Sequence, residues 1–234
     1  MFQTPLSRLI LALDVPTVPE AEALVDATAG SVGVYKIGLE LAMAGGIDLA
    51  RRLSAEGVPV FLDMKLLDIG NTVAGAVRNA GDLGVRFLTV HAYPQAMQAA
   101  RDACAPSLNL VAVTVLTSMG DRDLQEAGYG ALAADLVNHR LAAAKALGLT
   151  FVVCSPLEAR AAANLRLSPI TPGVRHAEDS AGDQKRVATP QQAVADGAEA
   201  IVVGRPIAQA ADPKAAAARY VSAIADGLGG RAGG

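Results

Sequence analysis

Short apolar runs alternate along the whole chain with longer, alanine-rich stretches. The longer stretches carry apolar residues at helical spacing, whereas the short runs have the length and the Val, Ile and Leu content of buried strands. This alternation is typical of repeated βα units and therefore of a parallel sheet. We predict eight strands, within the ranges 8–15, 32–38, 58–64, 86–92, 109–117, 150–155, 167–173 and 200–204.

Glycines mark the boundaries of these units. Gly57, Gly84, Gly148 and Gly197 each stand just before a predicted strand, where a helix-ending glycine in the left-handed conformation belongs. Helix starts are marked by a hydroxyl residue with Glu or Gln three positions later, the spacing of a capping box. These pairs are Thr17 with Glu20, Ser155 with Glu158, and Thr189 with Gln192.

Eight strands in 234 residues give about 29 residues per unit, which favours an α/β fold of the closed (β/α)8 TIM-barrel type. We predict a single barrel domain over residues 1–226 and a disordered glycine-rich tail over residues 227–234. The main alternative is an open, doubly wound sheet. Its dinucleotide-binding version lacks support because no GxGxxG turn follows the first strand, and the chain has no GxSxG motif of an α/β-hydrolase.

Composition and charge indicate how the core is filled and which partners and compartments are excluded. The chain is 52% hydrophobic but only 3% aromatic, so we expect Ala, Val, Leu and Ile to fill the core. A net charge of -3 without basic runs argues against nucleic acid as a partner. No apolar run approaches the ~20 residues of a membrane helix. Cys104 and Cys154 lie far apart and are expected to be reduced thiols, so we predict a cytoplasmic protein.

Charged residues follow the apolar runs of the first three strands. Strand one ends at Asp14, strand two at Lys36, and strand three at Asp63 and Lys65. Active sites of barrels lie at the carboxyl ends of the strands, so these four residues are candidate catalytic or binding groups. The alternative is that they form salt bridges that close the top of the barrel. Burying charges costs free energy, so four of them at one end of the barrel favour a catalytic or binding role over a purely structural one.

Alternation along strand three separates its charges. Residues two apart share a face, so Asp63 and Lys65 should point together into the barrel mouth, while Leu62 and Met64 pack outward. Asp68 falls beyond the strand, in a loop, at an odd offset from Asp63. Its carboxylate could serve its own site or that of a neighbouring subunit.

The last two strands lead into candidate phosphate-binding loops. Strand seven runs into TPGVR, which contains Arg175, and strand eight ends in VVGRPI, which contains Gly204 and Arg205. The loops after strands seven and eight are the usual phosphate site of this fold. An ordinary surface loop is the alternative. The segment 116–118 (LTS) after strand five offers hydroxyls for a polar ring, although alone it is a weak signal.

The three histidines do not form a ligand set. His91 ends strand four and is expected to be packed or to support the site indirectly, His139 lies in a helical stretch, and His176 lies in a loop. Because no His, Cys and carboxylate residues cluster in sequence, we predict no metal and no cofactor.

Taken together, the motifs LALDVP, YKIGLEL, FLDMKLLDIGNT, VTVLTSM, TPGVR, AGDQKR and VVGRP resemble the orotidine 5′-phosphate decarboxylase family. The resemblance extends from Asp14 to Arg205, and its DxKxxDI core is specific. It implies decarboxylation of orotidine 5′-monophosphate to UMP, the last step of de novo pyrimidine synthesis, in a homodimer.

The resemblance also implies roles for individual residues. Lys36, Asp63, Lys65 and Asp68 would form the catalytic charge array, with Lys65 protonating the C6 carbanion and Asp68 reaching across the dimer interface with Ile69 and Thr72. The substrate-binding residues implied are Asp14 and Lys36 for the ribose, Thr117 and Ser118 for the pyrimidine, and Gln184, Gly204 and Arg205 for the phosphate, with Arg175 beside them.

Two other functions remain open at this point. A metal-dependent sugar-phosphate decarboxylase or aldolase of the same barrel group can share the DxKxxD spacing, but it would need magnesium. A non-catalytic nucleotide-binding barrel would bind UMP and leave orotidylate unchanged.

Overall fold

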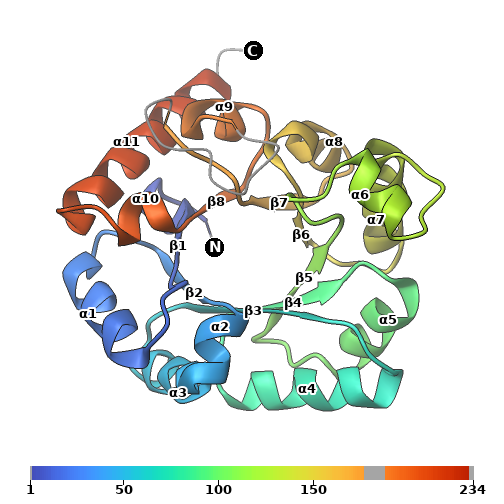
Figure 1. The fold of residues 1–234 in the computed structure, drawn as a ribbon, viewed down its shortest axis with the longest axis horizontal. Coiled ribbons are helices and arrows are strands. Elements are labelled where there is room, and N and C mark those ends of the chain that lie inside the picture. Colours follow the sequence, from blue (N-terminus) through green and yellow to red (C-terminus); the bar gives the residue numbers. More distant parts are fainter. Residues whose placement is uncertain (1, 177–187, 232–234) are drawn as a thin grey trace.

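A computed structural model describes residues 2–176 and 188–231 of the chain. Eight parallel strands form a closed barrel in which each strand pairs with its neighbours in sequence and β8 pairs with β1. Helices surround the ring of strands on all sides (Figure 1). The strands are β1 (Leu9–Ala12), β2 (Val34–Ile37), β3 (Val60–Leu66), β4 (Phe87–His91), β5 (Asn109–Val113), β6 (Phe151–Val153), β7 (Ser168–Thr171) and β8 (Ala200–Val203).

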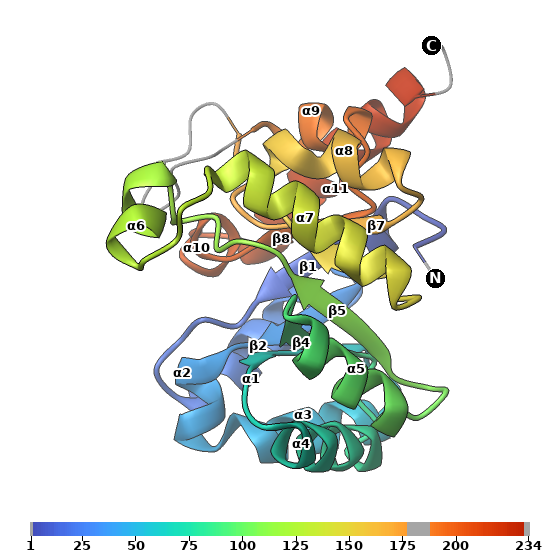
Figure 2. The ribbon, with the colours of Figure 1, turned by 90° about the vertical axis from the view of Figure 1, so that its right-hand side faces the viewer.

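The helices follow the strands in the order that a (β/α)8 barrel requires, with a few short extra turns. Figure 2 shows the barrel from the side, with α6 and α4 at different edges of the molecule. The helices are α1 (Val18–Thr28), α2 (Leu39–Leu41), α3 (Ile47–Ala55), α4 (Gly70–Asp82), α5 (Pro94–Ala103), α6 (Asp121–Glu126), α7 (Ala133–Ala146), α8 (Ala159–Asn164), α9 (Pro190–Ala195), α10 (Arg205–Ala208) and α11 (Pro213–Arg231).

The barrel and its eight strands confirm the predicted fold class, although most strands are shorter than the apolar runs that predicted them. The local signals are confirmed as well. The Thr17 and Thr189 side chains accept the backbone N–H groups of Glu20 and Gln192, and Ser155 forms a capping box with Glu158. All four boundary glycines have positive φ, between 74° and 115°.

The hydrophobic core has two layers, and the inner layer differs from the expectation. Between the sheet and the helices, aliphatic residues and Ala dominate, as predicted. Inside the barrel, however, all four phenylalanines of the chain gather: Phe2, Phe61 and Phe87 are buried and Phe151 packs against them. Their ring centroids are 5.4–6.1 Å apart, so offset and edge-to-face ring contacts close the barrel beneath the site.

The predicted disordered tail is wrong for residues 227–231, because α11 continues to Arg231. Tertiary packing overrides the weak helix propensity of glycine here. A Cβ added to Gly227 would lie 2.7 Å from the Gln191 carbonyl oxygen and 2.9 Å from the Val194 Cβ, so the absence of a side chain lets α11 approach α9 closely. Leu228 packs against the outer core. Residues 232–234 lie outside the described part of the chain.

Candidate active site

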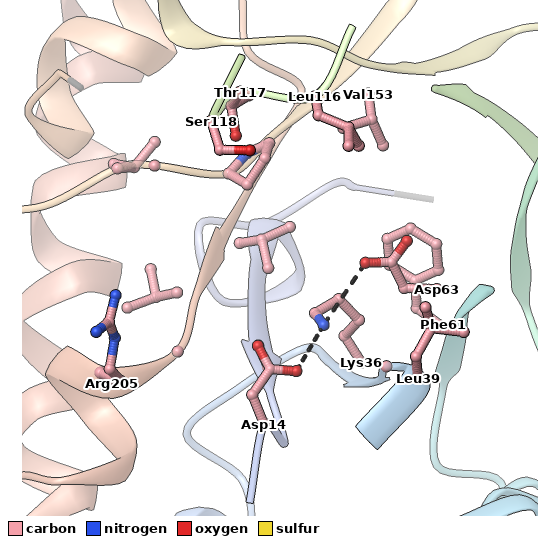
Figure 3. A pocket seen from close by; sticks show the side chains of 18 of the residues that line it. Asp14, Lys36, Leu39, Phe61, Asp63, Leu116, Thr117, Ser118, Val153 and Arg205 are labelled. Carbon is pink, nitrogen blue, oxygen red and sulfur yellow. Dashed lines mark hydrogen bonds and ion pairs between the residues drawn. The ribbon is translucent and has the colours of Figure 1, made fainter. Parts of the chain in front are cut away.

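The candidate site is a cavity of about 650 Å³ at the carboxyl ends of the strands. Its walls come from β1, β2, β3, β5, β6 and β8 and from loops at the carboxyl ends of the strands, including the loop after β7 (Figure 3). This position is the one predicted for the active site of a barrel. The predicted site residues that line the cavity are Asp14, Lys36, Asp63, Lys65, Thr117, Ser118, Arg175, Gly204 and Arg205.

Four of these residues form one chain of alternating charges. Lys36 Nζ lies 2.9 Å from Asp14 Oδ1 and 3.6 Å from Asp63 Oδ2, and Lys65 Nζ donates to the same Asp63 oxygen at 2.8 Å. Figure 3 shows the Lys36 ammonium between the two carboxylates. The four charges sum to zero, and each has at least one partner of opposite sign, as partly buried charges require.

Burial differs along this chain of charges. The side chains of Lys36 and Asp63 are 9% and 15% exposed, whereas Lys65 is 29% and Asp14 is 52% exposed. Burial alone would raise the pKa of the Asp63 carboxyl. The charges of Lys36 and Lys65, together with hydrogen bonds from Lys65 and Thr89, outweigh it and hold this pKa below its usual value. Asp63 is therefore an anion at neutral pH.

Strand β3 orients its residues as predicted. Phe61 belongs to the inner layer and Leu62 to the outer one, while Met64 packs against the outer layer. Lys65 also points to the cavity, but regular alternation is not the reason. Its φ is 49°, in the left-handed region, and the pairing with β4 shifts register between Leu62 and Leu66. A bulge, which the sequence pattern does not reveal, thus aims the Lys65 side chain.

The other walls supply hydroxyls, apolar surface and cations. Thr117 is buried and Ser118 is exposed, on the loop after β5, opposite Asp63 in Figure 3. Leu116 and Val153 add apolar surface beside them. Arg205 begins α10 directly after β8 and lies at the far side of the cavity from Asp63. One cavity can thus bind a ligand that carries a polar ring at one end and an anionic group at the other.

Asp68, Ile69 and Thr72 do not line this cavity, although each is a predicted site residue. All three are exposed, and the Ile69 side chain is 73% exposed. Asp68 Oδ1 accepts the backbone N–H of Ile69 at 2.6 Å at the start of α4. Gln184 lies outside the described residues.

Two further side chains stand near the charges. His91 ends β4 without lining the cavity, and its ring meets that of Tyr93 edge-on at 6.3 Å, which fits the expectation of a packed histidine. Thr89 hydrogen-bonds both Asp63 and Lys65, although no motif of the sequence points to this residue. The signal that the sequence offers is a hydroxyl within a mostly apolar strand, two residues before His91.

Among residues 2–176 and 188–231, no group of three or more His, Cys, Asp and Glu side chains is placed to hold a metal ion. Within the same residues, no helix is long and apolar enough to cross a membrane. Cys104 and Cys154 are both free thiols.

A closed (β/α)8 barrel with a charged cavity at the carboxyl ends of its strands has the architecture of a TIM-barrel enzyme, whose active site lies at this face. The comparison with known families places the chain within that class. Residues 7–220 match the model of the orotidine 5′-phosphate decarboxylase / HUMPS family, and the chain belongs to this family.

Individual proteins that are similar to this chain support the same family assignment. Proteins named orotidine 5′-phosphate decarboxylase from Methylobacterium sp. and Rhodopseudomonas palustris are 52% and 53% identical, each over 95% of this chain and over 98% and 95% of their own lengths. A crystal structure of orotidine 5′-phosphate decarboxylase from Lactobacillus acidophilus superimposes with a TM-score of 0.81. It is 33% identical and covers 92% of this chain and 98% of its own.

Proposed function

We propose that this protein decarboxylates orotidine 5′-monophosphate to UMP, the last step of de novo pyrimidine synthesis. The observation that carries the proposal is the Asp14, Lys36, Asp63, Lys65 array at the mouth of the barrel, in a chain about half identical to relatives that are named for this activity. The cavity has a cation at the end opposite the array, as a nucleoside monophosphate requires.

Lys65 is the proposed proton donor. When the bond between C6 and the carboxylate breaks, CO2 leaves and the bonding electron pair stays on C6. The Lys65 ammonium stabilises this carbanion and then transfers a proton to C6, while Asp63 lies close to the departing carboxylate. Solvent later returns a proton to the Lys65 amine.

Repulsion between Asp63 and the substrate carboxylate cannot supply the acceleration alone. Two like charges about 4 Å apart at an effective dielectric near 20 repel by about 4 kcal/mol, whereas enzymatic accelerations require roughly 8 to 23 kcal/mol. The rest is assigned to carbanion stabilisation by Lys65 and to binding energy from the distant phosphate. Gly204 and Arg205, with Arg175 and Gln184, are the proposed phosphate ligands, and Thr117 and Ser118 are proposed to contact the pyrimidine.

We further propose a homodimer in which Asp68, Ile69 and Thr72 complete the partner's site. Their exposure and their position outside the cavity of their own chain support this arrangement. We also propose that the protein acts in the cytoplasm and without a cofactor; the free thiols of Cys104 and Cys154 support the reducing compartment.

One assay tests the proposed reaction. The ultraviolet absorbance of orotidylate is followed with purified protein, with and without EDTA. We expect conversion to UMP at the same rate in both. Loss of activity in EDTA would favour the metal-dependent alternative, and binding of UMP without conversion of orotidylate would favour the non-catalytic one.

A further inference from the structure

Strand β3 leaves the regular ladder where its catalytic lysine stands. Leu62 pairs with Leu88 and Leu66 pairs with Val90, so four steps along β3 match only two along β4. Lys65 lies within this bulge with a φ of 49°, a left-handed conformation that is strained for a residue other than glycine. Something in the surroundings must hold the backbone in this state.

The Thr89 hydroxyl stabilises this backbone conformation of Lys65. It accepts the backbone N–H of Lys65 at 2.7 Å, in place of a ladder bond to a β4 carbonyl. Thr89 is fully buried on β4, and its backbone belongs to the regular part of the sheet, where it pairs with Val111. A rigid neighbouring strand thus fixes the bulge through one side chain.

The same hydroxyl orients the carboxylate. Thr89 Oγ1 donates to Asp63 Oδ1 at 3.1 Å, while Asp63 Oδ2 faces the ammonium groups of Lys65 at 2.8 Å and Lys36 at 3.6 Å. With Oδ1 held, rotation of the carboxylate is restricted and Oδ2 stays between the two cations. The hydroxyl has one proton and two lone pairs, so it can accept from Lys65 and donate to Asp63 at once.

We propose that Thr89 is a positioning residue for the decarboxylation: through one buried hydroxyl it sets both the backbone from which Lys65 extends and the orientation of Asp63. This inference rests on the proposed function. Thr89 does not line the cavity, so its effect acts through Lys65 and Asp63 and should appear in kcat more than in KM.

The chain offers a matched control in Thr28. This threonine is also fully buried and also makes two contacts, since its hydroxyl donates to the Leu24 carbonyl at 2.7 Å and lies 3.0 Å from the Tyr35 hydroxyl. It ends α1 and does not line the cavity. Thr28→Val therefore reports the cost of losing a buried hydroxyl without a connection to the charge array.

The experiment compares wild type, Thr89→Val, Thr89→Ser and Thr28→Val by steady-state kinetics with orotidylate and by urea unfolding. Misplacement of a catalytic group by about 1 Å can cost on the order of 100-fold in rate. We expect Thr89→Val to lower kcat by about 10- to 100-fold with KM changed less than about threefold. Thr89→Ser should recover most of kcat, and Thr28→Val should keep kcat while losing stability.

Thr89→Cys covers the case in which Thr89→Val does not fold, since a thiol fills the space but is a weak donor and acceptor. A wild-type kcat in Thr89→Val, or in Thr89→Cys if the valine variant is unfolded, would overturn the inference. A Thr89→Ser variant as slow as Thr89→Val would do so too. Wild-type protein that leaves orotidylate unchanged would instead refute the proposed function, so the two failures are distinguishable.

Discussion

The Lys65 ammonium donates to the Asp63 carboxylate at 2.8 Å, and both residues lie in the part of β3 where its pairing with β4 shifts register. The pair therefore owes its geometry to a local departure from regular sheet structure. Lys36 shares the same carboxylate, so removing any member leaves a charge unbalanced in a partly buried site.

Removal of the Lys65 ammonium should nearly abolish turnover. In Lys65→Ala, C6 has neither a cation to stabilise its electron pair nor a proton donor, and we expect kcat to fall by at least ~10³-fold, given that positioned acids contribute 10²–10⁴-fold. UMP should still bind, because the phosphate and ring contacts remain. Steady-state kinetics and UMP titration measure the two effects. Lys145→Ala, an exposed lysine on α7, is the control. Substantial activity in Lys65→Ala would refute the assignment.

Arg205 should act on the phosphate rather than on the ring. A hydrogen bond to a charged group contributes about 1.5–3 kcal/mol, so Arg205→Ala should lower kcat/KM for orotidylate by about 10- to 100-fold. Turnover of orotidine, which lacks the phosphate, should be unchanged. Arg122→Ala, whose exposed side chain pairs with Glu126 on α6, is the control. Equal losses with orotidine and orotidylate would contradict the phosphate role.

Much of the fold was predictable because it depends on local and periodic signals. Apolar runs, capping pairs and boundary glycines each act within a few residues, and eight units of about 29 residues leave little choice but a barrel. The end of α11 was not predictable. Gly227 favours a loop locally, but contact with α9 makes it helical, and such contact is invisible in the sequence.

The site also has a part that local sequence signals predict and a part that depends on contacts between strands. Asp14, Lys36 and Asp63 follow from their places at strand ends. The orientation of Lys65 was predicted correctly from simple alternation, yet the structure achieves it through a bulge held by Thr89 on a neighbouring strand. A contact between residues 24 positions apart leaves no periodic trace, which is why Thr89 was missed.

The proposed cross-subunit role of Asp68 can be tested by mixing two inactive variants. Lys65→Ala and Asp68→Ala homodimers each lack a group at both sites. If Asp68 acts in the partner's site, a mixed dimer has one intact site out of two, so mixed dimers isolated by two tags should have about half of wild-type activity. If Asp68 serves its own chain, both sites of the mixed dimer are defective and nothing is regained. Co-expression, purification by two tags and the absorbance assay distinguish these results.

A last prediction concerns His91 and the dependence of stability on pH. Burial lowers the pKa of His91, the positive charges of Arg140 and Lys65 lower it further, and the nearby Asp63 carboxylate opposes them less strongly. The folded protein therefore keeps this ring neutral at a pH where the unfolded chain, with an ordinary pKa of about 6.5, already binds a proton. The contribution of His91 to the free energy of unfolding is therefore fully present above about pH 6.5, and it is lost as the pH falls toward the pKa of His91 in the folded protein.

Substitution of His91 by Gln removes this titration. Between about pH 7.5 and 5.5, the free energy of unfolding should fall less in His91→Gln than in wild type, because the variant has no proton to take up at this position on unfolding. Urea unfolding at several pH values measures the difference. His139→Gln, at an exposed position on α7, should retain the wild-type slope. Parallel curves for His91→Gln and wild type would show that the ring is not held neutral by its buried, cationic surroundings.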